Sequence, residues 1–300
     1  MIEKEEISNE KIKWAFFGTS EFSVYVLEAL AARGLIPSLL VTAPDAPRGR
    51  GLQLSPSPAK VWALAHNIKV FEPAKLDSAA EAKLAETSSD VFVVASYGKI
   101  IPANIFNIPK HKTLNIHPSL LPKYRGSSPI QSVILDGVKE TGVTIMSIDE
   151  KMDHGPILVS QKISLENASG QLPDFPKLEK QLANDGANLL ASVLPKWLTG
   201  ETKATPQEET KATYTNKISK EDGLIAADVT KIENVPAAEQ YEIYKKIQAF
   251  KGWPGSYFFT ERNGKRIRVL ITKASWQNNN LKIERVILEG KKETDFGAYL

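Results

Sequence analysis

The fold follows from the stretch Lys11-Ile12-Lys13-Trp14-Ala15-Phe16-Phe17-Gly18-Thr19, an apolar run that ends in a glycine turn. An amphipathic stretch leads from there to Arg33, so the pattern predicts a strand, a turn and a helix. Gly34 ends that helix, and residues 36–41 give a second apolar run. Strands and helices that alternate in this way are typical of a parallel sheet.

The alternation continues through the first two thirds of the chain. Further strands are predicted at residues 70–71, 91–96, 142–148 and from 157, and further helices at 59–66, 78–86, 129–136 (capped by Ser127 or Ser128) and 178–198. We therefore expect an α/β fold with a doubly wound, mostly parallel sheet. The first turn is Gly18-Thr19-Ser20 rather than GxGxxG, so a dinucleotide-binding site is not supported.

A change in composition divides the chain near residue 200. We expect residues 11–199 to form the α/β domain, the polar residues 200–212 a linker, and residues 213–300 a second domain. The second domain is predicted to contain a helix at 237–250, strands at 256–260, 266–273 and 281–288, and a hairpin at Asn263-Gly264. Short strands around a small core suggest a β-barrel of the oligonucleotide-binding type.

The composition excludes several classes of function. The 300 residues include no cysteine, which rules out disulfides, thiol nucleophiles and Cys-ligated zinc. The four histidines show no spacing typical of metal ligands, so we expect no metal. The chain has no apolar run long enough for a membrane span, and its charged N-terminus has no signal-peptide pattern. We therefore expect a cytoplasmic protein that does not contact membranes.

Positive charge is concentrated in the last third of the chain. The net charge is +3, and residues 201–300 carry all of this excess, with 17 Lys and Arg against 14 Asp and Glu. From Lys245 to Lys273 there are eight basic residues and one acidic residue, Glu261. This modest excess of positive charge could bind a polyanion such as RNA, but an ordinary solvated surface gives the same pattern.

A polar pair stands at the end of one predicted buried strand. Asn115 and His117 are two residues apart, so on a strand their side chains point to the same face. Pro118 and Pro122 stiffen the loop that follows. Open α/β sheets bind ligands beyond the carboxyl ends of their strands, so this loop is a candidate site.

Asp153 lies in a turn after the strand at 142–148. If that strand is parallel to its neighbours, its loop opens on the same sheet edge as Asn115 and His117. An amide, an imidazole and a carboxylate suit direct acyl transfer to an amine. Asn115 and His117 would stabilise a tetrahedral intermediate, and Asp153 would assist proton transfer. Each residue also has an ordinary structural explanation, such as capping a strand or forming a turn.

A long polar loop joins residues 44 and 58. Arg48 and Arg50 carry two guanidinium groups in an Arg-Gly-Arg-Gly sequence flanked by prolines. Loops of this length are functional or disordered. The pattern fits contact with phosphates or a simply exposed loop.

Three sequence blocks stand out together: Leu114–Gly126 with Pro129-Ile130, Gly142–Met146 and Met152–Leu158. They resemble the signature of the folate-dependent formyltransferases, and within that family the chain is most similar to the methionyl-tRNA formyltransferases. Closer likeness comes from Phe17-Gly18-Thr19, Pro44-Asp45, Gly49-Arg50-Gly51, Pro56–Lys60, Phe71-Glu72-Pro73, Ala95–Pro102, Tyr214–Gly223 and Ile247–Gly255. The likeness covers nearly the whole chain.

The resemblance implies transfer of a formyl group from 10-formyltetrahydrofolate to the α-amine of methionyl initiator tRNA. It implies Asn115, His117 and Asp153 as the catalytic residues. It places the folate at Ser119, Leu120, Leu121, Pro122, Tyr97, Gly98 and Ile100. It makes RNA contacts of Arg48, Arg50, Lys245, Lys246, Lys251, Arg266 and Arg268, because guanidinium and ammonium groups bind phosphate. We expect a monomer.

The chain departs from the family pattern at two places. Ser96 stands where the family has Ala or Val, and residues 276–280 lead directly to the strand at 281–288, so the second domain is expected to be shortened. Two alternatives stay open. The acceptor could be another amine (a sugar nucleotide or purine precursor), or water in a 10-formyltetrahydrofolate hydrolase. The chain could also be a folate- or RNA-binding protein without activity.

Overall fold

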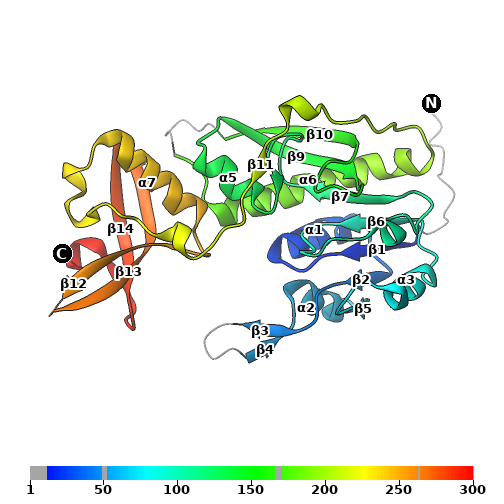
Figure 1. Cartoon of the computed structure of the whole chain (residues 1–300), viewed down its shortest axis with the longest axis horizontal. Coiled ribbons are helices and arrows are strands. Elements are labelled where there is room, and N and C mark those ends of the chain that lie inside the picture. The colour runs from blue at the N-terminus through cyan, green and yellow to red at the C-terminus, as the bar shows by residue number, and fades with distance from the viewer. Residues whose placement is uncertain (1–11, 49–52, 166–170, 263, 300) are drawn as a thin grey trace. The chain divides into compact units, whose positions relative to one another are not determined.

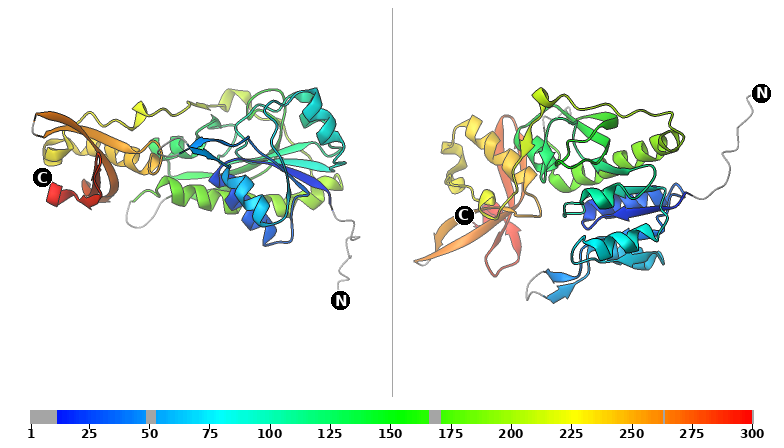
Figure 2. Two further views of the ribbon diagram at one scale, coloured as in Figure 1. Left: turned by 90° about the horizontal axis from the view of Figure 1, so that it is seen from below. Right: turned by 45° about the vertical axis from the view of Figure 1, so that its right-hand side comes forward.

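Seven strands form one sheet in the computed structural model, which describes residues 12–48, 53–165, 171–262 and 264–299. Their order across the sheet is β10-β9-β7-β6-β1-β2-β5. The strands are β1 (Trp14–Phe17), β2 (Leu39–Val41), β5 (Lys69–Phe71), β6 (Val91–Val94), β7 (Thr113–His117), β9 (Glu140–Ser147) and β10 (Ile157–Ser164). Figure 1 labels these strands in their order across the sheet, and Figure 2 shows the same elements from two other directions.

Five of these strands run parallel, from β7 through β6, β1 and β2 to β5. This confirms the doubly wound, mostly parallel sheet. The strand β9 is antiparallel to β7, with His117 opposite Thr144. The expectation that the loop after β9 opens on the same edge as the loop after β7 is therefore wrong.

The parallel strands are connected by the helices α1 (Glu21–Ala31), α2 (Pro58–Ala65), α3 (Ser78–Ala85) and α4 (Ala103–Phe106). The helix α5 (Pro129–Leu135) lies between β7 and β9, and α6 (Phe175–Leu198) follows β10. Side chains of α3 and α4 pack with Phe17 and Phe92 on one sheet face, and Phe16 is buried on the other. Ser57 caps α2 by accepting a hydrogen bond from the Lys60 amide. Ser128 stands at the N-cap of α5, but its side chain makes no capping hydrogen bond, contrary to expectation.

The segment predicted as a long loop at 44–58 contains a short hairpin. Its strands β3 (Ala46–Arg48) and β4 (Gln53–Ser55) pair antiparallel. The expected long loop therefore contains two short strands. Arg50 lies outside the described residues.

The chain divides into two compact units, each made of three segments. The first unit contains the residues up to His117 together with 144–159 and 183–207. The second contains 118–143, 160–182 and the residues from 208 onward. Each unit takes up separate stretches of sequence. The expected domain boundary, with a linker at residues 200–212, stays a prediction.

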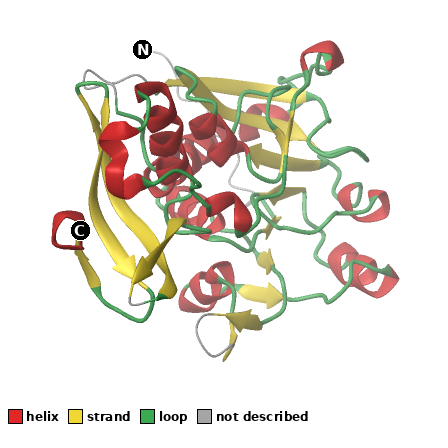
Figure 3. Cartoon of the chain, turned by 60° about the vertical axis from the view of Figure 1, so that its left-hand side comes forward, coloured by secondary structure: helices red, strands yellow, loops and turns green. Residues whose placement is uncertain are grey.

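The last third of the chain forms a four-stranded antiparallel sheet with one long helix, consistent with a small barrel (Figure 3). Its elements are α7 (Ala237–Ala249), β12 (Ser256–Arg262), β13 (Lys265–Gln277), β14 (Asn280–Leu288), β15 (Glu293–Asp295) and α8 (Phe296–Tyr299). Tyr244, Ile247, Phe258 and Val286 belong to its core. Arg262 pairs with Lys265, which confirms the hairpin, although Asn263 lies outside the described residues.

Short elements complete the second unit. They are β8 (Arg125–Gly126), β11 (Tyr214–Thr215) and the 3₁₀ helices η1 (Glu209–Lys211), η2 (Glu221–Gly223) and η3 (Val229–Asn234). The strands β8 and β11 pair in parallel. In the part of the chain that the structure describes, no helix is both long and apolar enough to cross a membrane.

Candidate active site

The candidate site begins on β7, in the first unit. Asn115 and His117 lie on this strand, and the His117 side chain is only 4% exposed. Ile116 between them is buried on the other face, which confirms the alternation that the strand pattern predicts. A buried imidazole next to an amide is a costly choice for a core unless both groups have polar partners.

Asp153 provides a partner for both side chains. Its Oδ1 atom accepts a hydrogen bond from Asn115 Nδ2 at 3.4 Å and lies 3.6 Å from His117 Nδ1. The three predicted catalytic residues therefore meet. They do so because the loop after β9 folds back toward β7, and not because the two strands end at one edge. Contacts of this length are common in free enzymes and shorten when substrate binds.

The loop that carries Asp153 has an unusual backbone. Asp153 has φ +50°, in the left-handed region that few residues other than Gly, Asn and Asp adopt. A Cβ atom at Gly155 would lie 1.9 Å from the carbonyl oxygen of Ser147, so only glycine fits there. His154 Nδ1 lies 2.6 Å from Asp149 Oδ2. These features hold the turn that presents the carboxylate.

A residue from the predicted linker also holds this loop. The Gln207 side chain donates from Nε2 to the carbonyl oxygens of Asp153 at 2.9 Å and Gly155 at 2.8 Å. Sequence reasoning missed Gln207 because polar residues without periodicity indicate a linker. The sequence contains no local signal for a contact between residues about 50 positions apart.

The predicted folate residues of the first unit lie after β6. Tyr97 is 3% exposed and packs edge to face on Phe17, and burial raises the pKa of its phenol to about 12. Gly98 has φ +79°, and Ile100 is 83% exposed. Tyr97 is therefore mainly a core residue, while Ile100 offers an apolar surface. Their role in folate binding stays a prediction.

The other predicted folate residues belong to the second unit. Ser119 is buried and donates to the carbonyl oxygen of Lys123 at 2.7 Å. Leu120 packs so closely on Gly142 that a Cβ atom there would lie 2.5 Å from Leu120 Cδ2. Leu121 is buried, and the carbonyl oxygen of Pro122 accepts from the Thr213 amide at 3.2 Å. The segment is firmly held, and its contact with folate stays a prediction.

Most of the basic residues predicted to bind RNA have partners within the chain. Lys245 is buried and pairs with Glu242, Lys246 donates to the carbonyl oxygen of Leu224, and Lys251 pairs with Asp174. Burial lowers the pKa of Lys246. Arg266 and Arg268 stack on Phe259 and Tyr257. Arg48 belongs to β3. These RNA contacts stay predictions.

Arg125 is a buried charged residue that sequence reasoning did not single out. Its side chain is fully buried and donates to the carboxylate of Glu209 and the hydroxyl of Tyr214. The guanidinium joins the loop after β7 to the segment around β11, within the second unit. Arg125 lies within the sequence block Leu114–Gly126, but nothing in that block indicates that its partner is Glu209.

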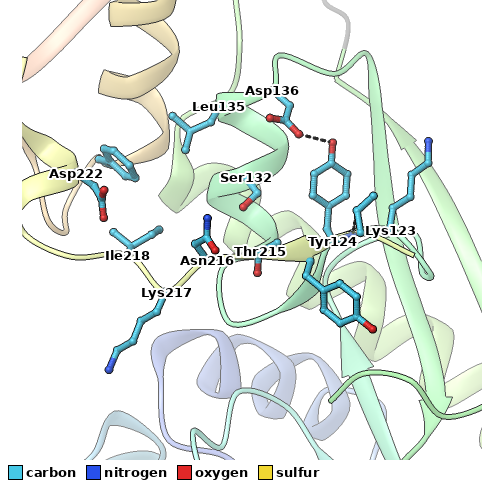
Figure 4. Close-up of a pocket in the computed structure, with 13 residues that line it drawn as sticks. Lys123, Tyr124, Ser132, Leu135, Asp136, Thr215, Asn216, Lys217, Ile218 and Asp222 are labelled. Atoms are coloured by element: carbon cyan, nitrogen blue, oxygen red, sulfur yellow. Dashed lines mark hydrogen bonds between the residues drawn. The ribbon is translucent and has the colours of Figure 1, made fainter. Parts of the chain in front are cut away.

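The second unit also contains a cavity of about 500 Å³ (Figure 4). Its walls come from the loop after β7, from α5 and from residues 213–222. Figure 4 shows the hydroxyl of Tyr124 directed at Asp136, to which it donates at 2.8 Å. None of the predicted site residues lines this cavity. Among the described residues, no group of three or more acidic residues and histidines could hold a metal ion.

Comparison with known proteins identifies relatives along most of the chain. A family model described as formyl transferase matches residues 11–194. The methionyl-tRNA formyltransferase of Sulfurihydrogenibium sp. (strain YO3AOP1) is 38% identical over 94% of this chain and 86% of its own length. That of Thermus thermophilus is 40% identical over 85% of this chain and 78% of its own length.

Solved structures share the fold. Methionyl-tRNA formyltransferase from Clostridium thermocellum superposes with a TM-score of 0.59 and 18% identity, over 92% of this chain and 98% of its own. The N-formyltransferase from Helicobacter canadensis was solved with folinic acid and dTDP-3-aminofucose. It superposes with a TM-score of 0.61 and 20% identity, over 89% of this chain and 88% of its own. The family model and the sequence relatives show that this chain belongs to the formyl transferase family and, within it, to the methionyl-tRNA formyltransferases.

Proposed function

We propose that the chain transfers a formyl group from 10-formyltetrahydrofolate to the α-amino group of methionyl initiator tRNA. The observation that carries the proposal is the meeting of Asn115, His117 and Asp153 in a chain of this family. Acyl transfer to an amine needs a donor for the oxyanion and an acceptor for a proton. The three side chains supply both.

Asn115 is the proposed oxyanion donor. Its amide nitrogen carries two hydrogens, and one of them is directed at Asp153. The other can donate to the oxygen of the formyl group as the α-amine forms its bond to the formyl carbon. A preorganised amide donor of this kind contributes about 10²- to 10³-fold to kcat.

Asp153 and His117 are the proposed proton-transfer pair. The new bond joins the amine nitrogen to the formyl carbon, and the bond from that carbon to N10 of the folate breaks. The amine must lose a proton and N10 must gain one. Asp153 Oδ1 lies 3.6 Å from His117 Nδ1, so a small closure on substrate binding would let the imidazole share the proton or stabilise the oxyanion beside Asn115.

The residues after β6 fit an aromatic formyl donor. Ile100 exposes an apolar side chain next to Gly98, whose φ of +79° turns the backbone sharply. Burial of such a side chain by a flat ring is favourable by about 25 cal/mol per Å² of apolar surface. For methionyl-tRNA as the acceptor, support comes from the relatives, which are named methionyl-tRNA formyltransferases. The guanidinium groups of Arg266 and Arg268 add to it, because such groups bind RNA phosphates well.

The test is to incubate the protein with 10-formyltetrahydrofolate and methionyl initiator tRNA and to detect formylmethionine by mass spectrometry. We expect formylmethionyl-tRNA in amounts equal to the tetrahydrofolate released. Tetrahydrofolate released without formylated tRNA would identify a hydrolase. Formylation of dTDP-amino sugars but not of Met-tRNA would identify a sugar enzyme. Either result would contradict the proposal.

A further inference from the structure

We propose that Gln207 is a positioning residue for formyl transfer, because it holds the backbone that presents the Asp153 carboxylate. This inference rests on the proposed function of Asp153. The hydrogen bonds that carry it go to main-chain carbonyls of the loop, and not to the Asp153 carboxylate itself. Gln207 reaches the loop from a segment that sequence reasoning interprets as a linker.

The orientation of the Gln207 side chain is determined by its partners. Its Nε2 atom lies 2.9 Å from the carbonyl oxygen of Asp153 and 2.8 Å from that of Gly155. Both partners are carbonyl oxygens, which only accept hydrogen bonds, so the NH₂ end must face them. One side chain therefore uses both of its N–H groups to hold two carbonyls on either side of His154.

The loop needs a contact of this kind. Asp153 has φ +50°, a conformation that costs free energy in any residue with a Cβ atom. Some support comes from the loop and its ends, where Asp149 accepts from the Lys151 amide and Ser147 donates its amide to Pro156. Gln207 adds a contact from a distant part of the chain.

Gln207 is itself held in place. Two residues earlier, Thr205 and Ile157 exchange two backbone hydrogen bonds of 2.8 Å each, so the segment is paired with the first residue of β10. The side chain is half-buried. The first unit thus contains a fixed support, and Gln207 extends from it to the catalytic loop.

A small shift of the loop would disturb the chemistry. The Asp153 carboxylate already lies at 3.4 Å from Asn115 Nδ2 and 3.6 Å from His117 Nδ1, near the limit of a useful contact. A displacement of about 1 Å in a catalytic group can lower the rate about 100-fold. Loss of the Gln207 contacts should therefore lower kcat more than it changes substrate binding.

The experiment compares Gln207→Met, which keeps length but removes both donors, with Gln277→Met, at the end of β13 in the second unit. We expect Gln207→Met to lower kcat about 10- to 100-fold while both KM values change less than about threefold. Gln277→Met should behave as wild type. A kcat within about twofold of wild type would overturn the proposal, as would a loss explained entirely by unfolded protein.

A third variant, Gln207→Glu, distinguishes donation from packing. Its carboxylate would face two carbonyl oxygens at neutral pH, whereas the protonated acid can donate one hydrogen bond. Its kcat relative to wild type should therefore rise as the pH is lowered toward about 5, and that of Gln207→Met should not. Parallel pH profiles for the two variants would contradict a role for the donors.

Backbone hydrogen exchange provides a readout that does not depend on activity. Gln207→Met should accelerate exchange in residues 149–156 and leave the amides of β7 unchanged. Unchanged exchange in the loop would overturn the inference even for an active enzyme. If wild type failed to formylate Met-tRNA but the loop exchanged faster in Gln207→Met, the proposed function would be wrong and the structural role of Gln207 would stand.

Discussion

The guanidinium of Arg125 donates from Nη1 to both carboxylate oxygens of Glu209, at 3.1 and 3.0 Å. The two groups differ greatly in environment, because the Arg125 side chain is fully buried whereas that of Glu209 is 59% exposed. Removing one partner therefore has different consequences from removing the other.

Glu209→Ala should lower the free energy of unfolding by about 3 kcal/mol, because it removes the carboxylate that faces a buried cation. Arg125→Met should cost less, about 1–2 kcal/mol, because Glu209 can be hydrated when the guanidinium is removed. Urea denaturation at about pH 7 measures both values. Glu208→Gln is the control: its pair with Lys211 is exposed on both sides, so its loss should leave the free energy of unfolding unchanged within error. Equal losses in the two main variants would contradict the argument.

Tyr97→Phe should increase stability at neutral pH. The Tyr97 hydroxyl is buried and has no hydrogen-bond partner in the described part of the chain, a situation that costs about 1–3 kcal/mol. The variant should therefore gain about 1 kcal/mol in thermal or urea unfolding at neutral pH. A loss of stability would show that the Tyr97 hydroxyl has a favourable partner within the protein. A raised KM for 10-formyltetrahydrofolate alone would show that the hydroxyl contacts the folate.

The same tyrosine should make stability depend on pH in alkaline solution. Burial raises the pKa of Tyr97 to about 12 in the folded chain, whereas in the unfolded chain it ionises near pH 10. The unfolded state therefore binds fewer protons between these values. Stability is fully present below about pH 10 and falls as the pH rises toward about 12, by about 2–3 kcal/mol. Tyr97→Phe should remove this part of the fall in urea unfolding measured from about pH 9 to about pH 11.5, and an unchanged slope would contradict it.

The catalytic residues can be tested by substitutions that remove one functional group at a time. Asp153→Asn removes the carboxylate and should lower kcat by about 100-fold or more with little change in KM. Asn115→Ala should lower kcat about 10²- to 10³-fold, because it removes the oxyanion donor. Single-turnover formylation separates this chemical step from product release. A kcat near wild type in Asp153→Asn would exclude the proposed proton transfer.

Periodic patterns predicted most of the fold. The apolar run at β1 and the hairpin around Gly264 depend on neighbouring residues, so local patterns predicted them correctly. The antiparallel direction of β9 depends on how distant strands pair, and no local pattern encodes it. The meeting of Asn115, His117 and Asp153 was predicted from residue type, but the reason given for it was wrong. The contacts of Gln207 and Arg125 join residues far apart in sequence, which explains why they were missed.

The stacked arginines of β13 should contribute to RNA binding through their charge. The guanidinium of Arg266 lies 4.0 Å from the centre of the Phe259 ring and that of Arg268 lies 3.9 Å from the centre of the Tyr257 ring. Arg266 is exposed and Arg268 half-buried, and the guanidinium nitrogens that the rings do not cover can bind phosphates. The double variant Arg266→Gln with Arg268→Gln should weaken tRNA binding.

Salt dependence distinguishes a direct phosphate contact from a general effect of charge. Each lost contact should reduce the slope of log K against log salt by about 1, so the double variant should reduce it by about 2. Arg285→Gln is the matched control, because that guanidinium is paired with Glu293 and Asp295 on neighbouring β15. It should leave the slope unchanged. If the double variant kept the wild-type slope, Arg266 and Arg268 would have to be removed from the proposed RNA surface.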